Sequence, residues 1–149
     1  MAAGLIFSET GSGPGAPFLS LSNAGDTEGA SNLNGLRVLV VEDSWQVSAA
    51  LKRLLVACGA EVAGPAATIA DAARLVSERT VDVALVDINL RRGELAYDLI
   101  DQLHDRGIRI VVVTGYDEVS IDEGKVAAVL QKPVSASRLL QSLRPPALE

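Results

Sequence analysis

Residues 36–43 have the sequence LRVLVVED, in which an apolar run rich in β-branched side chains ends in two carboxylates, Glu42 and Asp43. The pattern recurs at residues 83–87, VALVD, where the run ends in Asp87. Short runs of this kind are typical of strands that are buried on both faces of a parallel sheet. We therefore predict a parallel sheet with acidic residues at the ends of its strands.

Two later runs end in polar residues of other types. Thr114 follows the apolar run at 110–113, and Lys132 comes just after Val129-Leu130. Because the carboxyl ends of parallel strands form the ligand crevice of an open α/β sheet, we expect these side chains to converge with the carboxylates. A hydroxyl, an ammonium and several carboxylates at one place suit a divalent cation and a phosphoryl group.

The composition limits the class of protein. A chain of 149 residues with 48% hydrophobic and 3% aromatic residues suits one domain with an aliphatic core. The net charge of −6 argues against nucleic acid or an anionic membrane as the main partner. No stretch has the roughly 18 apolar residues of a membrane span, and the N-terminus lacks the pattern of a signal peptide. We expect a cytoplasmic protein.

The chain divides into three segments. Residues 1–34 are rich in Gly, Ser, Asn and Pro, and we expect a flexible tail or linker there. The glycines at 11–15 do not form a phosphate loop, since no strand pattern precedes them and no Gly-Lys-Ser/Thr follows. Residues 35–144 form the predicted folded domain, and 145–149 a C-terminal tail.

Strand and helix patterns alternate through this domain and predict a doubly wound, five-stranded parallel α/β sheet. The predicted strands are 36–41, 61–64, 81–86, 108–113 and about 126–130. The predicted helices run from Trp45 to the stop at Gly59, from a cap at Thr68, from about 94 to 105, and from a cap at Ser135.

One β-α unit departs from this alternation. Only eleven residues separate Thr114 from Val126, and they include four acidic residues and two glycines. That length leaves room for at most one or two helical turns. We predict a short, acidic, mobile segment in place of a regular fourth helix.

The acidic residues suit a magnesium site. Crowded carboxylates repel one another, and a hard cation with oxygen ligands relieves this repulsion. The expected ligands are Glu42, Asp43, Asp87 and the backbone carbonyl of Asn89. One histidine and one cysteine give poor support for zinc. The alternative for the Glu42-Asp43 pair is a solvated helix start that complements the helix dipole.

Asp87 is the predicted nucleophile, because a carboxylate can attack phosphorus without first losing a proton. The alternative is an ordinary turn residue after a strand. The Thr114 hydroxyl can donate to a phosphoryl oxygen, and Gly115 leaves room for that group. Lys132 supplies a positive charge, and the Lys132–Pro133 bond is a candidate for a cis peptide.

These motifs, in this order, resemble the receiver domain of two-component signalling, which has a flavodoxin-like fold. The resemblance covers residues 36–144. It implies a phosphoacceptor at Asp87, an acid pair at Glu42 and Asp43, a switch hydroxyl at Thr114 and a phosphate-binding lysine at Lys132. It also implies Mg²⁺ as cofactor, and a histidine kinase or phosphotransfer protein as the phosphoryl donor in a phosphorelay.

Two departures point to a subgroup. The position of the family's switch aromatic holds Val129, and the fourth helix is short. With Thr114-Gly115-Tyr116, these features resemble the alphaproteobacterial receivers nicknamed FAT GUY, although Val112-Val113 replaces Phe-Ala. That resemblance implies a kinase of the HWE or a related class, and a monomer rather than the family's usual dimer. Tyr116 is either a substitute switch aromatic or a rim residue.

An outside phosphoryl donor is expected to touch the first helix. Trp45 begins this helix beside Asp43, so it suits a kinase contact, with half-buried packing as the alternative. His104 lies on the polar side of a helix pattern, where a solvated side chain is expected and a phosphohistidine is not.

Four other interpretations use the same pattern. A haloacid-dehalogenase-like phosphatase also has an aspartyl nucleophile and Mg²⁺, but it needs a carboxylate where this chain has Asn89. A nucleotide or flavin binder of the same fold needs a glycine-rich turn, which the strand ends lack. A receiver cut from a hybrid histidine kinase and a docking-only receiver are the other two. We expect a signalling domain with self-catalysed phosphoryl transfer, not an enzyme that turns over a separate substrate.

Overall fold

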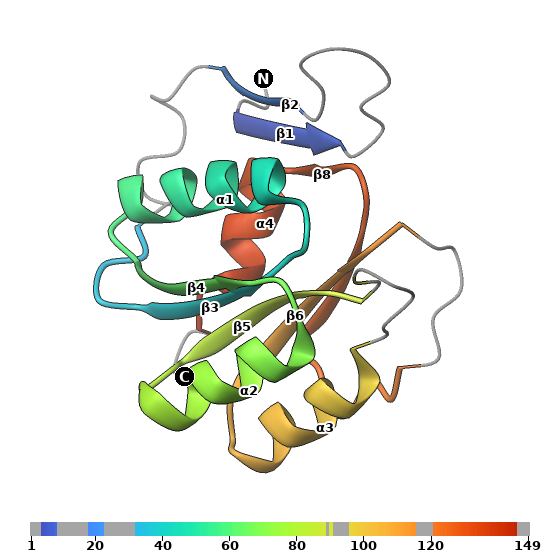
Figure 1. The fold of residues 1–149 in the computed structure, drawn as a ribbon. Helices are drawn as coiled ribbons and strands as arrows, with labels where there is room; N and C mark the ends of the chain where they lie inside the picture. Colours follow the sequence, from blue (N-terminus) through green and yellow to red (C-terminus); the bar gives the residue numbers. More distant parts are fainter. Residues whose placement is uncertain are drawn as a thin grey trace.

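A five-stranded parallel sheet is the middle layer of the fold (Figure 1). This computed structural model describes residues 4–8, 18–22, 32–88, 90, 96–115 and 121–145. In spatial order the strands are β4 (Glu61–Ala66), β3 (Arg37–Val41), β5 (Val83–Asp87), β6 (Arg109–Thr114) and β7 (Ala128–Gln131). The predicted parallel sheet is confirmed, and each predicted strand lies within a few residues of its observed place.

Helices cover both faces of this sheet. They are α1 (Trp45–Ala57), α2 (Ile69–Glu78), α3 (Tyr97–Asp105) and α4 (Ala136–Leu143). In Figure 1, α1 and α4 lie on one side of the sheet, and α2 and α3 lie on the other. None of the described helices is long and apolar enough to cross a membrane.

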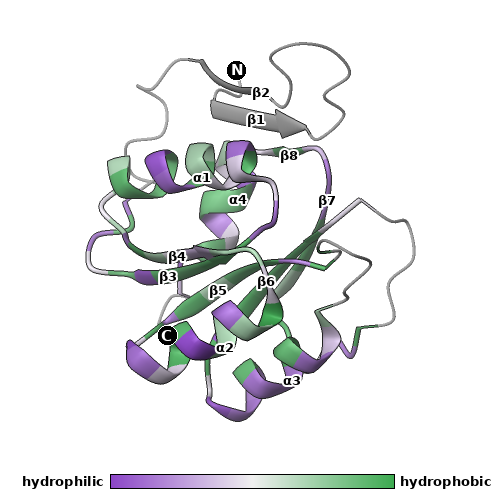
Figure 2. Ribbon diagram, in the orientation of Figure 1, coloured by the Kyte–Doolittle hydropathy of each residue, from purple (hydrophilic) through white to green (hydrophobic). Residues whose placement is uncertain are grey.

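The alternation of side chains along each strand builds two cores. On β3, Val38 and Val40 pack in the core beneath α1 and α4, whereas Leu39 and Val41 pack in the core of α2 and α3. All four are at most 1% exposed. Full burial of each such side chain contributes about 1.5–3 kcal/mol. Figure 2 shows the result as apolar strands between helices with polar outer surfaces.

Hydroxyl side chains begin three of the helices. Thr68 accepts a hydrogen bond from the Asp71 N–H at the start of α2, and Ser135 accepts one from Arg138 at the start of α4. Both caps were predicted. Each satisfies a backbone donor that a helix leaves unpaired in its first turn.

The second predicted strand is longer than its apolar pattern indicated. β4 continues past residue 64 to Ala66, and its register against β3 shifts between Leu39 and Val41. Gly64 has φ +97°, and a Cβ there would lie 3.0 Å from the Val40 carbonyl oxygen. The irregularity thus depends on a residue without a side chain, so the pattern of apolar residues did not reveal it.

The N-terminal segment contains regular structure that the sequence analysis did not predict. β1 (Gly4–Ser8) pairs antiparallel with β2 (Phe18–Ser22) and with the short strand β8 (Val134–Ser135). The sequence analysis expected a flexible tail or linker over residues 1–34, and these two strands lie within that range. The turn-forming residues of this segment do not indicate the pairing, because one partner of β1 is β8, which lies more than a hundred residues later in the chain.

The folded domain also begins earlier than predicted. Leu33 is 2% exposed and belongs to the core beneath α1 and α4. Its N–H donates to the Cys58 carbonyl at the end of α1, at 2.8 Å. We therefore place the start of the domain near residue 32 rather than 35.

The region of the shortened helix is only partly described. Residues 121–127 form turns and no helix, while 116–120, like 91–95 before α3, lie outside the described residues. The Lys125 ammonium lies 2.6 Å from a carboxylate oxygen of Asp101 on α3. This ion pair, which raises the pKa of Lys125, ties the end of the segment to its neighbouring helix.

An ion pair joins two strands at the opposite end of the sheet from their polar ends. The guanidinium of Arg37 donates to both carboxylate oxygens of Asp82 at 3.0 Å, and the Arg37 backbone N–H donates at 2.8 Å. The hydrogen bond from the Arg37 side chain, offset in part by desolvation, lowers the pKa of Asp82 below its usual 3.8.

The Arg37–Asp82 pair predicts a pH dependence of stability. A carboxyl whose pKa is lowered by folding stabilises the fold above its unfolded pKa, and this contribution disappears as the pH falls through the folded pKa. Asp82→Asn should therefore lower stability at pH 7 and flatten the loss of stability below pH 4. Urea unfolding at several pH values measures this, and an unchanged slope in the variant would contradict it. Asp98→Asn, at an exposed position on α3, is the control.

Candidate functional site

Adjacent strands bring the predicted site residues to one edge of the sheet. Four strands of the sheet pair as parallel neighbours, in the spatial order β3, β5, β6 and β7. Asp87 is the last residue of β5 and Thr114 is the last residue of β6. Glu42 directly follows β3, and Lys132 directly follows β7. Their common edge is where a parallel sheet places its ligand crevice.

Three carboxylates form a compact group there. Glu42, Asp43 and Asp87 each offer an oxygen, and these oxygens lie within 4.8 Å of one another. Glu42 and Asp87 are each 5% exposed, whereas Asp43 is partly exposed. The group is therefore buried at Glu42 and Asp87 and partly accessible at Asp43.

Lys132 supplies a positive charge to this pocket. Its Nζ lies 3.5 Å from Oδ2 of Asp87 and 4.0 Å from Oε1 of Glu42, and its side chain is only 9% exposed. Carboxylates this deeply buried need a partner charge, because burial penalises an isolated ion. The ammonium provides that partner in the resting site.

The charge of the group suits a divalent cation. Three carboxylates and one ammonium, all ionised, leave a formal charge of −2. The donors are all oxygens, which Mg²⁺ prefers, and the open side at Asp43 leaves room for the waters that Mg²⁺ retains. The residues present therefore fit this ion.

Backbone hydrogen bonds hold the loops of the site to their neighbours. The Glu42 N–H donates to the Ala66 carbonyl at 2.9 Å, just beyond the paired part of β3. The Lys132 N–H donates to the Thr114 carbonyl at 2.8 Å. The second bond joins the hydroxyl-bearing residue and the cationic residue through the main chain.

Ser44 also helps to build the site, and the sequence analysis did not identify it. Its backbone N–H donates to Oε2 of Glu42 at 3.1 Å, and its hydroxyl caps α1 by accepting from the Val47 N–H. One residue thus orients an acidic side chain and starts the adjacent helix. A serine before an apolar helical pattern is the signal that could have identified it.

The structure describes some of the residues predicted around the site and leaves others outside the described residues. Trp45 is 72% exposed, so the alternative of half-buried packing is wrong. Gly115 and Pro133 are exposed, and the Lys132–Pro133 peptide is cis as predicted. A Cβ added at Gly115 would meet no described atom within 4 Å. Asn89 and Tyr116 lie outside the described residues.

A protein-family model matches most of this chain. The family is described as "Response regulator receiver domain", and the match covers residues 38–144. All five predicted pocket residues fall inside this range. No curated protein sequence gives a significant match.

Solved structures give a similar result. SdrG from Sphingomonas melonis Fr1 is 30% identical over 73% of this chain and 96% of its own, with a TM-score of 0.61. A response regulator from Burkholderia pseudomallei, solved with a phosphorylated aspartic acid, calcium ion and citrate, is 25% identical over 73% of this chain and 66% of its own, with a TM-score of 0.66.

The response regulator PhyR from Brucella abortus shares the fold at 21% identity and a TM-score of 0.65. The match covers 78% of this chain but only 49% of PhyR, so this chain spans about half of that protein's length. Together these comparisons favour the receiver interpretation over the phosphatase alternative.

Magnesium binding can be followed through the single tryptophan. Trp45 lies two residues from Asp43, so we expect added Mg²⁺ to change its fluorescence in a saturable way. Asp43→Asn should weaken the apparent affinity at least about tenfold, because it removes one of three charged ligands. Glu78→Gln, which removes an exposed carboxylate on α2, should leave the titration unchanged. Equal affinity of Asp43→Asn and the parent protein would contradict the site.

Proposed function

Because this chain belongs to the family of response regulator receiver domains, we propose that it accepts a phosphoryl group from a phosphohistidine onto Asp87. One observation carries the assignment: the Asp87 carboxylate lies among two other carboxylates and 3.5 Å from the Lys132 ammonium. The chain thereby functions as a receiver in two-component signalling.

The transfer follows from the chemistry of a carboxylate. An oxygen of Asp87 attacks the phosphorus in line with the P–N bond of the donor, an O–P bond forms, and the P–N bond breaks. The imidazole leaves with the electron pair of that bond and takes a proton from solvent. The product is an aspartyl phosphate, whose oxygens the Lys132 ammonium would bind in this proposal.

Glu42, Asp43 and Asp87 would hold Mg²⁺, with the backbone carbonyl of Asn89 proposed as a further ligand. When bound, this ion supplies neutralisation of the charge that develops on the phosphoryl oxygens. Glu42 is kept in position by the Ser44 N–H and by its own backbone bond to β4. The chain's role is thus to keep a preorganised set of oxygen ligands at the acceptor.

Thr114 and Lys132 are the proposed switch residues. A phosphoryl group on Asp87 adds negative charge and hydrogen-bond acceptors beside Lys132 and at the edge of the sheet where Thr114 ends the neighbouring strand. We propose that the hydroxyl and the ammonium then turn toward it, and that the segment after Gly115 follows. The Lys125–Asp101 ion pair on this segment is the contact that such a movement would rearrange.

The phosphoryl donor is a histidine kinase or phosphotransfer protein, in keeping with the family. We propose that Trp45, exposed at the start of α1, is part of its contact, since large exposed aromatics are common anchors at interfaces. The finer assignment to a kinase of the HWE or a related class rests on the Thr114-Gly115-Tyr116 motif and on Val129. We place the exchange in the cytoplasm, where the ATP that charges such kinases is found.

Receiver domains are signalling domains rather than turnover enzymes. We propose that this chain catalyses only the gain and loss of its own phosphoryl group. Residues 1–31 are then an extension or linker to the receiver at about 32–144, and 145–149 a C-terminal tail.

Acetyl phosphate with Mg²⁺ tests the acceptor. The parent protein should gain one phosphoryl group by intact-mass measurement, and Asp87→Asn should gain none. Asp98→Asn, a matched change at an exposed position, should gain it as the parent does. Phosphorylation of Asp87→Asn to the same extent as the parent would overturn the assignment.

Beryllofluoride with Mg²⁺ tests the switch. This phosphoryl mimic should change amide hydrogen exchange at residues 121–127. These residues follow Thr114 closely along the chain, so a shift of Thr114 toward the mimic would displace them. Thr114→Ala should still bind the mimic but show a smaller change, whereas Thr80→Ala, at an exposed site, should match the parent. Identical exchange with and without the mimic in the parent protein would show that the segment does not respond.

A further inference from the structure

One serine connects an acidic residue of the site to the first turn of α1. The backbone N–H of Ser44 donates to Oε2 of Glu42 at 3.1 Å, and the Ser44 hydroxyl accepts from the Val47 N–H at 3.3 Å. The Glu42 carboxylate and the start of the helix are therefore held by the same residue.

The Glu42 carboxylate is flanked at both of its oxygens. Oε2 accepts the bond from Ser44, and Oε1 lies 4.0 Å from Nζ of Lys132. Glu42 is only 5% exposed, so bulk water contributes little to orienting it. A hydrogen bond to a metal ligand fixes the direction in which that ligand points, and its loss typically weakens metal binding about 10–100-fold. The Ser44 N–H is placed to orient Glu42 in this way.

The first turn of α1 carries the exposed Trp45 and is bonded back to Ser44. The Ser48 N–H donates to the Ser44 carbonyl at 2.9 Å, and the buried Ser48 hydroxyl donates to the Trp45 carbonyl at 3.1 Å. The first turn has no acidic residue of its own. The negative charge that a helix N-terminus favours comes instead from the carboxylates that precede it.

We propose that Ser44 couples the binding of Mg²⁺ to the order of this first turn. Once Glu42 is fixed as a ligand, the Ser44 N–H has a fixed acceptor. The Ser44 backbone is then kept in the extended conformation of a helix cap, with φ −82° and ψ 111°, and its bonds to Val47 and Ser48 persist for longer. By linkage, an ordered first turn also raises the affinity for the ion. Ser44 is a positioning residue, because it acts on the ion through Glu42.

This coupling rests on the magnesium site of the proposed function and adds a form of regulation to it. Trp45, the proposed contact for the phosphoryl donor, belongs to the turn that Ser44 holds. A donor that docks on Trp45 therefore meets a more ordered surface when Mg²⁺ is present. Docking is thereby favoured in the state that is ready for transfer.

Substitutions at position 44 separate the two bonds. Ser44→Pro removes the N–H and the hydroxyl, and the observed φ of −82° is close to that of a proline ring. Ser44→Ala removes the hydroxyl alone. We expect the Mg²⁺ concentration at half-saturation, followed by Trp45 fluorescence of the full chain, to rise at least about tenfold in Ser44→Pro and about threefold in Ser44→Ala. Ser44→Asn keeps the N–H and a capping oxygen, so it should match the parent.

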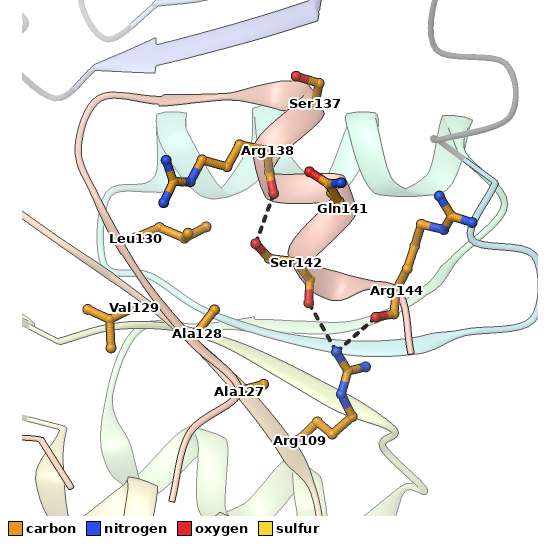
Figure 3. Close-up of a pocket in the computed structure, with 10 residues that line it drawn as sticks. All are labelled: Arg109, Ala127, Ala128, Val129, Leu130, Ser137, Arg138, Gln141, Ser142 and Arg144. Atoms are coloured by element: carbon orange, nitrogen blue, oxygen red, sulfur yellow. Dashed lines mark hydrogen bonds between the residues drawn. The ribbon is translucent and has the colours of Figure 1, made fainter. Parts of the chain in front are cut away.

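Two controls separate this role from a general loss of stability. Thr68→Ala removes the equivalent cap of α2, so it should lower the urea midpoint as Ser44→Ala does but leave Mg²⁺ binding unchanged. Ser142→Ala removes the same hydroxyl group from α4. Figure 3 shows that hydroxyl donating to the Arg138 carbonyl, at 2.9 Å, near Arg109 at the other end of β6 from the site. This variant should also bind Mg²⁺ as the parent does.

Amide hydrogen exchange measures the coupling without any phosphoryl transfer. Saturating Mg²⁺ should slow exchange at Val47 and Ser48 of the parent protein at least about threefold, and should not slow it in Ser44→Pro. The Asp71 N–H, which donates to the Thr68 cap in the first turn of α2, should exchange at the same rate with and without the ion.

Three results would overturn the proposal. They are half-saturation in Ser44→Ala at the same Mg²⁺ concentration as in the parent, an equal rise in Thr68→Ala, and exchange at Val47 and Ser48 that Mg²⁺ leaves unchanged or accelerates. Ser44→Ala decides the first of these even if Ser44→Pro fails to fold. A parent protein that binds Mg²⁺ but gains no phosphoryl group at Asp87 would contradict the proposed function while leaving the role of Ser44 intact, so the two failures are distinguishable.

Discussion

The pairing of one buried ammonium with buried carboxylates is the interaction on which this site depends. Lys132 lies between Asp87 and Glu42, and all three side chains are at most 9% exposed. Without the lysine, the burial of these carboxylates would be strongly unfavourable. With it, the pocket still has an excess of negative charge, which a divalent cation can neutralise. This excess of negative charge is what suits the group to a cation with oxygen ligands.

The sheet makes this arrangement rigid. Its strands are covered on both faces, so each site residue follows a stretch of backbone that has no freedom to shift. Backbone bonds beyond the strands, such as those of Glu42 to Ala66 and Lys132 to Thr114, extend this order into the loops. The rim is different, because Trp45 and Gly115 are exposed and Asp43 is partly so. Buried acceptor residues beneath exposed neighbours suit a site that must hold a phosphoryl group in place and also be accessible to the protein that donates it.

The order of apolar runs and polar endings determined the parallel sheet, the two-sided core and the group of Glu42, Asp43, Asp87, Thr114 and Lys132. These follow from local pattern, because a strand buried on both faces can tolerate polar residues only where it ends. Helix caps such as Thr68 were predictable for the same local reason. The bulge at Gly64, the Leu33 contribution to the core and the pairing of β1 with β8 were not. Only the tertiary structure shows these features. Each brings together residues that are far apart in the chain, and a pattern of apolar and polar residues along the sequence does not say which distant residues will be in contact.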